Sequence, residues 1–149
     1  MSLVMIMQAL ADQINNSLSV GTAGTAVPVI DDLQITPLLN IDPTPPSVDV
    51  YPADPFQEGI AFGNANNDLR LSVRARVTTA DHDAGQSLLL SMMDPTAATS
   101  LAKAIGADRQ LGTACSSLTV EGPTGFGVYT DAGGQGSLLG AVWTVRVIP

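Results

Sequence analysis

Cysteine, histidine and basic residues are scarce in this chain, and each shortage argues against a class of function. Cys115 is the only cysteine, so no disulfide can form within the chain, which favours a reducing compartment. Six Lys and Arg stand against 14 Asp and Glu, for a net charge of −8. Because phosphate contacts need clustered Lys and Arg, the acidic balance argues against ordinary nucleic-acid binding.

Long apolar runs and surface charge are also lacking. No stretch approaches the roughly 20 apolar residues of a membrane-spanning helix, so we expect no membrane span. At 149 residues the chain is expected to form one domain, residues 1–149. Charged residues make up 13% of the chain, about half the usual share. Either much of the surface is neutral or other chains cover part of it; we favour the second interpretation, because uncovered apolar patches invite aggregation.

The clearest pattern in the sequence is the alternation of apolar and polar residues from Asp68 to Thr79. A repeat of two predicts a β-strand with one buried face. Its polar face carries three of the six basic residues, Arg70, Arg74 and Arg76. In so acidic a chain we expect these arginines to meet acidic residues of a neighbouring subunit or to line a lumen. The alternative is that they are solvated on an exposed sheet face.

Helical spacing recurs in three segments. Residues 3–18 carry apolar residues at three- and four-residue steps, which predicts a helix with one core-facing stripe. A second helix is expected from about Thr79 to Met93, because residues 78–81 fit a capping box. A third, short helix is expected to start with Asp94 as N-cap and Pro95 in first position, and to end at Ile105 before Gly106.

Strand patterns fill much of the remaining chain. Part of residues 20–46 is expected to form an edge strand, and 47–51 a short strand followed by a loop over 52–67. Near the carboxyl end, strands are expected at 117–121 and 125–129, linked by a turn over 121–124. A last strand over 138–148 has two partly apolar faces, so it lies centrally or against another subunit. The prediction is an α+β fold, a mainly antiparallel β-sheet with two or three helices packed on it.

Two segments are candidate contact regions with other proteins, the loop from Phe56 to Asn67 and the linker from Asp131 to Ser137. Long loops in compact domains often carry function, and two of the three phenylalanines lie in the first one. The alternative is that Phe56 and Phe62 simply pin the loop to the core. The residues predicted to make these contacts are Phe56, Ile60, Phe62, Asn64, Asn67, Asp131 and Gln135.

Residues with catalytic or ligand chemistry are few. Asp81, His82 and Asp83 are the only cluster that suggests a metal or acid–base site, but adjacent helical residues point in different directions. Cys115 lacks a neighbouring base and is expected to be a buried small hydrophobe. The glycine-rich segments 21–25 and 133–136 lack the lysine of a phosphate-binding loop. We therefore predict no enzyme activity, no cofactor and no metal.

Three segments together resemble the tail terminator proteins of long-tailed double-stranded DNA phages, particularly those of actinobacterial hosts. They are VDVYPADPFQ (48–57), LRLSVRARVTTADHDAGQSLLLSMMD (69–94) and GGQGSLLGAVWTVRVIP (133–149). The resemblance extends over about two-thirds of the chain. It contains no catalytic motif to compare.

The resemblance implies a homohexameric ring that caps the finished tail tube and ends its polymerisation. Its implied partners are the tail tube protein and the head–tail connector proteins, and its implied location is the tail and neck of the virion, after assembly in the host cytoplasm. Genome DNA would pass through the lumen without specific binding, and an acidic lumen suits that passage.

Two alternatives are kept. One is another neck component, a head–tail connector or a tail tube subunit that polymerises by itself into long cylinders. The other is a small ligand- or metal-binding domain that uses Asp81, His82 and Asp83.

Overall fold

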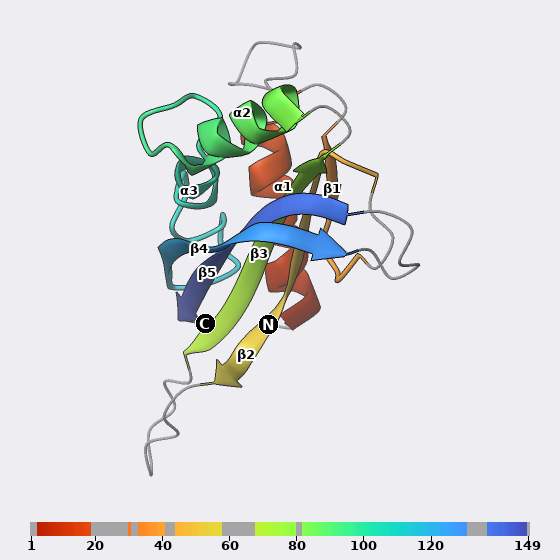
Figure 1. Cartoon of the computed structure of the whole chain (residues 1–149). Coiled ribbons are helices and arrows are strands. Elements are labelled where there is room, and N and C mark those ends of the chain that lie inside the picture. Colours follow the sequence, from red (N-terminus) through yellow and green to blue (C-terminus); the bar gives the residue numbers. More distant parts are fainter. Residues whose placement is uncertain are drawn as a thin grey trace.

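The structure of this chain, a computed structural model, describes residues 3–18, 30, 33–40, 44–57, 68–79, 82–130 and 137–148. Three helices and five strands follow one another in the order α1 (Leu3–Leu18), β1 (Gln34–Thr36), β2 (Ser47–Gln57), β3 (Leu69–Thr78), α2 (His82–Met93), α3 (Leu101–Ile105), β4 (Ser117–Thr130) and β5 (Ser137–Ile148) (Figure 1). The strands form one mixed sheet in the order β1-β2-β3-β5-β4. β1 and β2 are parallel, and the other pairs are antiparallel. The predicted α+β fold is confirmed.

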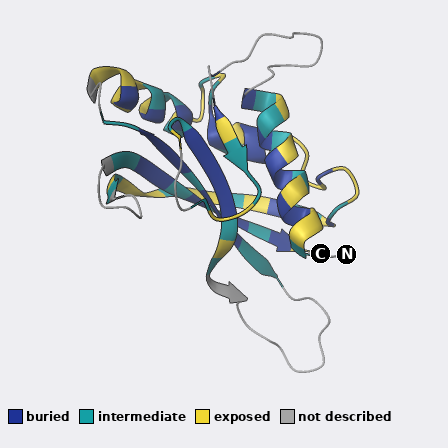
Figure 2. Ribbon diagram, turned by 90° about the vertical axis from the view of Figure 1, so that its right-hand side faces the viewer, coloured by how far each residue is buried: buried dark blue, intermediate teal, exposed yellow. Residues whose placement is uncertain are grey.

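The core lies between the helices and one face of the sheet. Alternate residues of the central strands are buried there, as the alternation in the sequence predicts, including Val73 of β3 and Trp143 of β5, which are directly opposite in register. α1 adds its apolar stripe, of which Ile6, Leu10, Ile14 and Leu18 are fully buried. Figure 2 shows the burial running along the helix sides that face the sheet, with exposed residues on the outer sides. β5 lies between β3 and β4, so its central position is confirmed.

β2 is longer than predicted, because residues 52–57 continue the strand in place of a loop. Its parallel neighbour β1 pairs only with residues 47–49. After Asp49, the edge of β2 that faces away from β3 is therefore not paired with β1. A proline in this part of β2 removes no hydrogen bond to β1. The register shifts between Pro52 and Gln57, which accommodates the two prolines of the segment as a local irregularity.

β4 is one strand of 14 residues where two strands and a turn over 121–124 were predicted. The predicted turn is wrong because its residues form irregularities inside the strand. The register against β5 shifts between Glu121 and Thr124 and again between Thr124 and Gly127. Gly122 and Gly125 adopt positive φ angles of 108° and 67°, which let the chain absorb the extra residues without leaving the sheet.

The helix starts also differ from the prediction. α2 begins at His82 and not at Thr79, and α3 begins at Leu101 with Ser100 as its N-cap, the Ser100 hydroxyl accepting from the Lys103 amide at 3.3 Å. Asp94 caps no helix, because its carboxylate accepts from the Thr96 amide at 2.9 Å and the Thr96 hydroxyl at 2.7 Å in a local turn. Gly106 ends α3 as expected.

Candidate functional site

Polar side chains gather on the face of the sheet opposite the helices. We name this surface the arginine face. Its members are Asp49 and Tyr51 of β2, Arg70, Ser72, Arg74 and Arg76 of β3, and Thr144 and Arg146 of β5. The register places Asp49 opposite Arg74, and Arg70 opposite Arg146. Four of the chain's six basic residues thus lie on one face of three adjacent strands.

Asp49 is the centre of a compact ionic cluster on this face. Arg74 binds its carboxylate through two nitrogens, with Nη2 at 2.9 Å from Oδ2 and Nε at 3.3 Å from Oδ1. Arg76 places Nη2 at 3.3 Å from Oδ2 of the same carboxylate and donates to the Asn40 carbonyl oxygen at 2.8 Å. The backbone amide of Asn40 in turn donates to Asp49 Oδ2 at 3.1 Å. The cluster therefore ties β2, β3 and the segment after β1 together.

This cluster is buried and carries an excess of positive charge. The side chain of Asp49 is fully buried, that of Arg76 is 5% exposed and that of Arg74 is 16% exposed. Two guanidinium groups share one carboxylate. Burial lowers the pKa of Arg76, and the Asp49 carboxylate opposes that shift. An arginine stays protonated in proteins, so this buried charge depends on Asp49 for its compensation.

Aromatic rings flank the more exposed arginine. The guanidinium carbon of Arg74 lies 5.1 Å from the ring centre of Tyr51 and 6.0 Å from that of Tyr129. Tyr129 donates its hydroxyl to the Gly125 carbonyl oxygen at 2.7 Å. Its ring packs so closely on Gly140 that a Cβ there would approach within 2.9 Å. Burial raises the pKa of Tyr51, against the opposing effect of Arg74. The rings and the carboxylate together fix the position of Arg74.

A second ion pair lies toward the far end of the face. Arg146 places Nη2 at 2.8 Å from Oδ2 of Asp68. Arg70 and Arg146 lie directly opposite each other in the sheet, and like charges in this position are destabilising. The negative charge of Asp68 reduces this repulsion. This pair is partly open to water, so it is more weakly held than the Asp49 cluster.

The three predicted arginines thus lie together, with Arg74 and Arg76 held by a carboxylate of their own chain. Their role at a subunit interface or lumen stays a prediction. Sequence reasoning missed Asp49, although a signal existed: Asp49 alternates with Val48 and Val50, which places it on the polar side of its strand.

The predicted contact residues fall largely outside the part of the chain that the structure describes. Phe56 belongs to β2 by its backbone, and its side chain is not described. The others, Ile60, Phe62, Asn64, Asn67, Asp131 and Gln135, lie outside the described residues. Their role in contacts stays a prediction.

The residues considered for metal or nucleophilic chemistry lie only partly within the described ranges. Asp83 is exposed in the first turn of α2, while Asp81 and the His82 side chain lie outside the description. Among the described residues, no group of three or more His, Cys, Asp and Glu is placed to hold a metal ion. Cys115 is buried as predicted, and burial raises the pKa of its thiol. A raised pKa lowers the fraction of reactive thiolate.

No protein-family model matches the chain, and no curated protein matches it. Within the described ranges, no helix is both long enough and apolar enough to cross a membrane. Among the described residues, the arginine face gathers the ion pairs of Asp49 with Arg74 and Arg76 and of Asp68 with Arg146. Arg146, whose side chain is 41% exposed, is a basic group of this face that can meet an acidic surface.

Proposed function

We propose that this protein is a structural virion subunit that closes into a ring, caps the tube of a phage tail, ends its polymerisation and joins the tail to the neck. The observation that carries the proposal is the two-sided sheet: all three helices pack on one face, and four of six basic residues lie on the other. The resemblance of residues 48–57, 69–94 and 133–149 to tail terminator proteins supplies the identity of the assembly.

The distribution of charge supports association with further copies. On and directly beside the arginine face, four arginines against Asp49, Asp68 and Glu121, which the register places opposite Thr144, leave a net charge of +1. The whole chain has a net charge of −8, so the residues outside this set carry −9. A basic face on one copy is complementary to the acidic surface of the next. Contacts between two different surfaces of the same chain generate a closed ring when the rotation between copies closes.

The proposed mechanism of capping is geometric. A ring presents identical copies of one surface to the last ring of the tail tube and a different surface upward, toward the neck. It covers the exposed surfaces of the tube and offers no new ones of the same kind, so growth ends. No covalent chemistry is required for this role.

Electron microscopy of the purified protein, alone and mixed with growing tail tubes, tests the proposal. We expect single rings that do not stack, and tubes that stop growing when a ring is attached. Long cylinders formed by the protein alone would favour the tail tube alternative. A monomer at every concentration that leaves tube growth unchanged would overturn the proposal.

Arg146 is the appropriate residue for a charge-reversal test of the arginine face, because its side chain is 41% exposed. Reversing Arg74 or Arg76 would bring a negative charge against buried Asp49 and disrupt the fold itself. We expect Arg146→Glu to weaken ring formation, and Lys103→Glu, the same charge change at an exposed position on α3, to leave it intact. Equal assembly of the two variants would remove Arg146 from the subunit contact.

A further inference from the structure

The outer edge of β4 is open in the described part of the chain. β4 is the last strand in the sheet order and pairs with β5 on its inner side. An edge strand presents backbone N–H and C=O groups that can pair with another strand. Residues 117–121 pair with β5 without a register shift, so the edge is regular in this part of β4.

A groove runs along this edge beside α3. It has a volume of about 300 Å³ and is lined by Leu118, Thr119 and Val120 of β4, by Ala102 and Gly106 at α3, and by Arg109. Successive residues of a strand point to opposite faces. A cavity that touches three successive residues therefore follows the edge of the strand and not one of its faces. The groove lies between α3 and β4, beside the open edge at which a further strand could pair.

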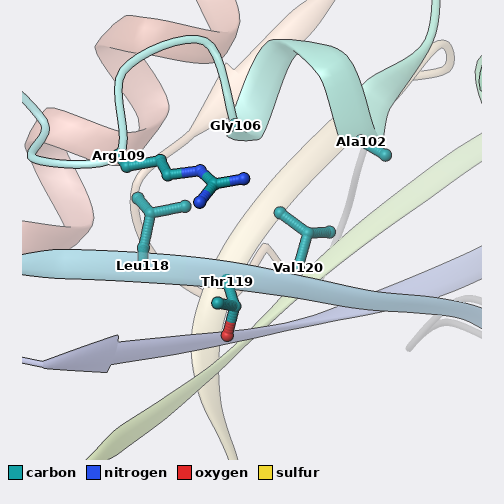
Figure 3. Close-up of a pocket in the computed structure, with 6 residues that line it drawn as sticks. All are labelled: Ala102, Gly106, Arg109, Leu118, Thr119 and Val120. Carbon is teal, nitrogen blue, oxygen red and sulfur yellow. The ribbon is translucent and has the colours of Figure 1, made fainter.

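Arg109 supplies the charge in this groove. Its side chain reaches across Leu118 in the direction of Val120, between β4 and α3 (Figure 3). Among the described residues Arg109 forms no ion pair, in contrast to Arg74, Arg76 and Arg146. The remainder of the lining is apolar or small, apart from Thr119. An extended segment with one acidic side chain fits this lining, because its carboxylate can pair with Arg109 while its other residues contact small and apolar groups.

We infer that an extended acidic segment of a second copy of this chain docks in the groove as an additional strand beside β4, with a carboxylate on Arg109. Charge complementarity favours a second copy, since the chain carries 14 acidic residues against six basic ones. Phe126 and Val128, 46% and 68% exposed, lie farther along the same strand. A copy paired along β4 would cover them, as large exposed apolar groups at interfaces commonly are.

This inference rests on the proposed ring, because it assigns one of the surfaces by which neighbouring copies meet. Hydrogen exchange of the wild-type protein tests it directly. We expect the backbone amides of residues 118–120 that point away from β5 to gain protection when the protein assembles, relative to dilute protein. Rings that form with unchanged exchange in β4 would overturn the inference and leave the ring intact.

Variants of the groove provide the second test. Arg109→Glu reverses the charge and Ala102→Trp fills the groove, so we expect each to weaken self-association by more than about tenfold. Lys103→Glu is the matched control: this exposed lysine donates to the Thr96 carbonyl oxygen, and its variant should assemble within about twofold of wild type. Thermal unfolding checks that each variant folds.

The outcomes separate the two proposals. Assembly of Arg109→Glu and Ala102→Trp at wild-type strength would overturn the groove contact while leaving the ring intact. A wild-type protein that never self-associates would overturn both. Protection of β4 that arises only on mixing with tail tubes would refute a second copy as the occupant.

Discussion

Replacement of Asp49 by asparagine tests how much the ionic cluster around Asp49 contributes to the stability of the fold. Asn has nearly the same shape as Asp but no charge, so Asp49→Asn removes the compensation of two guanidinium groups while changing the packing little. Both Arg74 and Arg76 are largely buried, and the neutral amide cannot accept from them as a carboxylate does. The expected result is a marked loss of stability.

The size of the loss follows from the burial of the partners. Removing one member of a buried ion pair costs about 3–5 kcal/mol, because a buried charge is left without compensation. The partial exposure of Arg74 places the expectation at the lower end, about 3 kcal/mol. For a chain of this size each kcal/mol lowers Tm by about 2–4 °C, so we expect a decrease of about 10 °C.

Urea and thermal unfolding at a concentration where the protein is monomeric measure this loss. Asp68→Asn is the matched control, because the same change is made at a carboxylate whose pair with Arg146 is partly exposed. There we expect a loss of no more than about 1 kcal/mol. Equal losses in the two variants would refute the reasoning that burial gives the Asp49 cluster its importance.

A combined replacement extends the test. Asp49→Asn together with Arg74→Met and Arg76→Met removes all three charges at once and keeps similar volumes, and the asparagine oxygen can still accept from the Asn40 backbone amide. Because an apolar replacement of a buried ionic cluster is often neutral or stabilising, we expect the stability lost in Asp49→Asn to be largely recovered. A triple variant as unstable as Asp49→Asn would indicate that packing, and not uncompensated charge, explains the single variant.

Three further predictions concern other parts of the fold. Gly85→Ala should destabilise by about 1–3 kcal/mol although alanine favours helices, because its Cβ would overlap the Thr78 carbonyl oxygen. Gly127→Ala should be near neutral in the same urea titration, because its Cβ would lie 4.0 Å from the nearest atom, the Gly125 carbonyl oxygen, which is an ordinary contact. Burial raises the pKa of Tyr51, so its contribution to stability is complete below the unfolded value near 10.0 and is lost as pH rises above it; unfolding measured from pH 9 to 11 should show a smaller loss in Tyr51→Phe. Cys115, buried and with a raised pKa, should react with a thiol reagent at pH 8 far more slowly than free cysteine until urea unfolds the chain, and rapid reaction in the folded state would contradict its placement.

The spacing of apolar residues in the sequence predicted the helix and the strand that bury only one of their faces. The apolar stripe of residues 3–18 matches α1 at both ends, and the alternation of residues 68–79 matches β3 within one residue at each end. In both segments a single face is buried, so the periodicity of the sequence is the periodicity of the packing. The two partly apolar faces of residues 138–148 predicted either a central position or a subunit contact, and β5 lies centrally, between β3 and β4.

Features that depend on partners distant in the sequence were not predictable in this way. The Asp49 cluster exists because β2 and β3 pair in one particular register, 25 residues apart in the chain, and no local pattern fixes that register. The glycines of β4 indicated a turn, but pairing with β5 keeps them in the sheet as irregularities. The groove beside α3 likewise depends on how β4 and α3 lie relative to each other.

The mass of the purified wild-type protein in solution, measured by light scattering over a wide concentration range, tests the central claim most directly. The account predicts a discrete closed assembly of about six copies, each of 15.3 kDa, that does not grow further as concentration rises. A single 15.3 kDa species throughout the range, or an assembly that lengthens without limit, would contradict it.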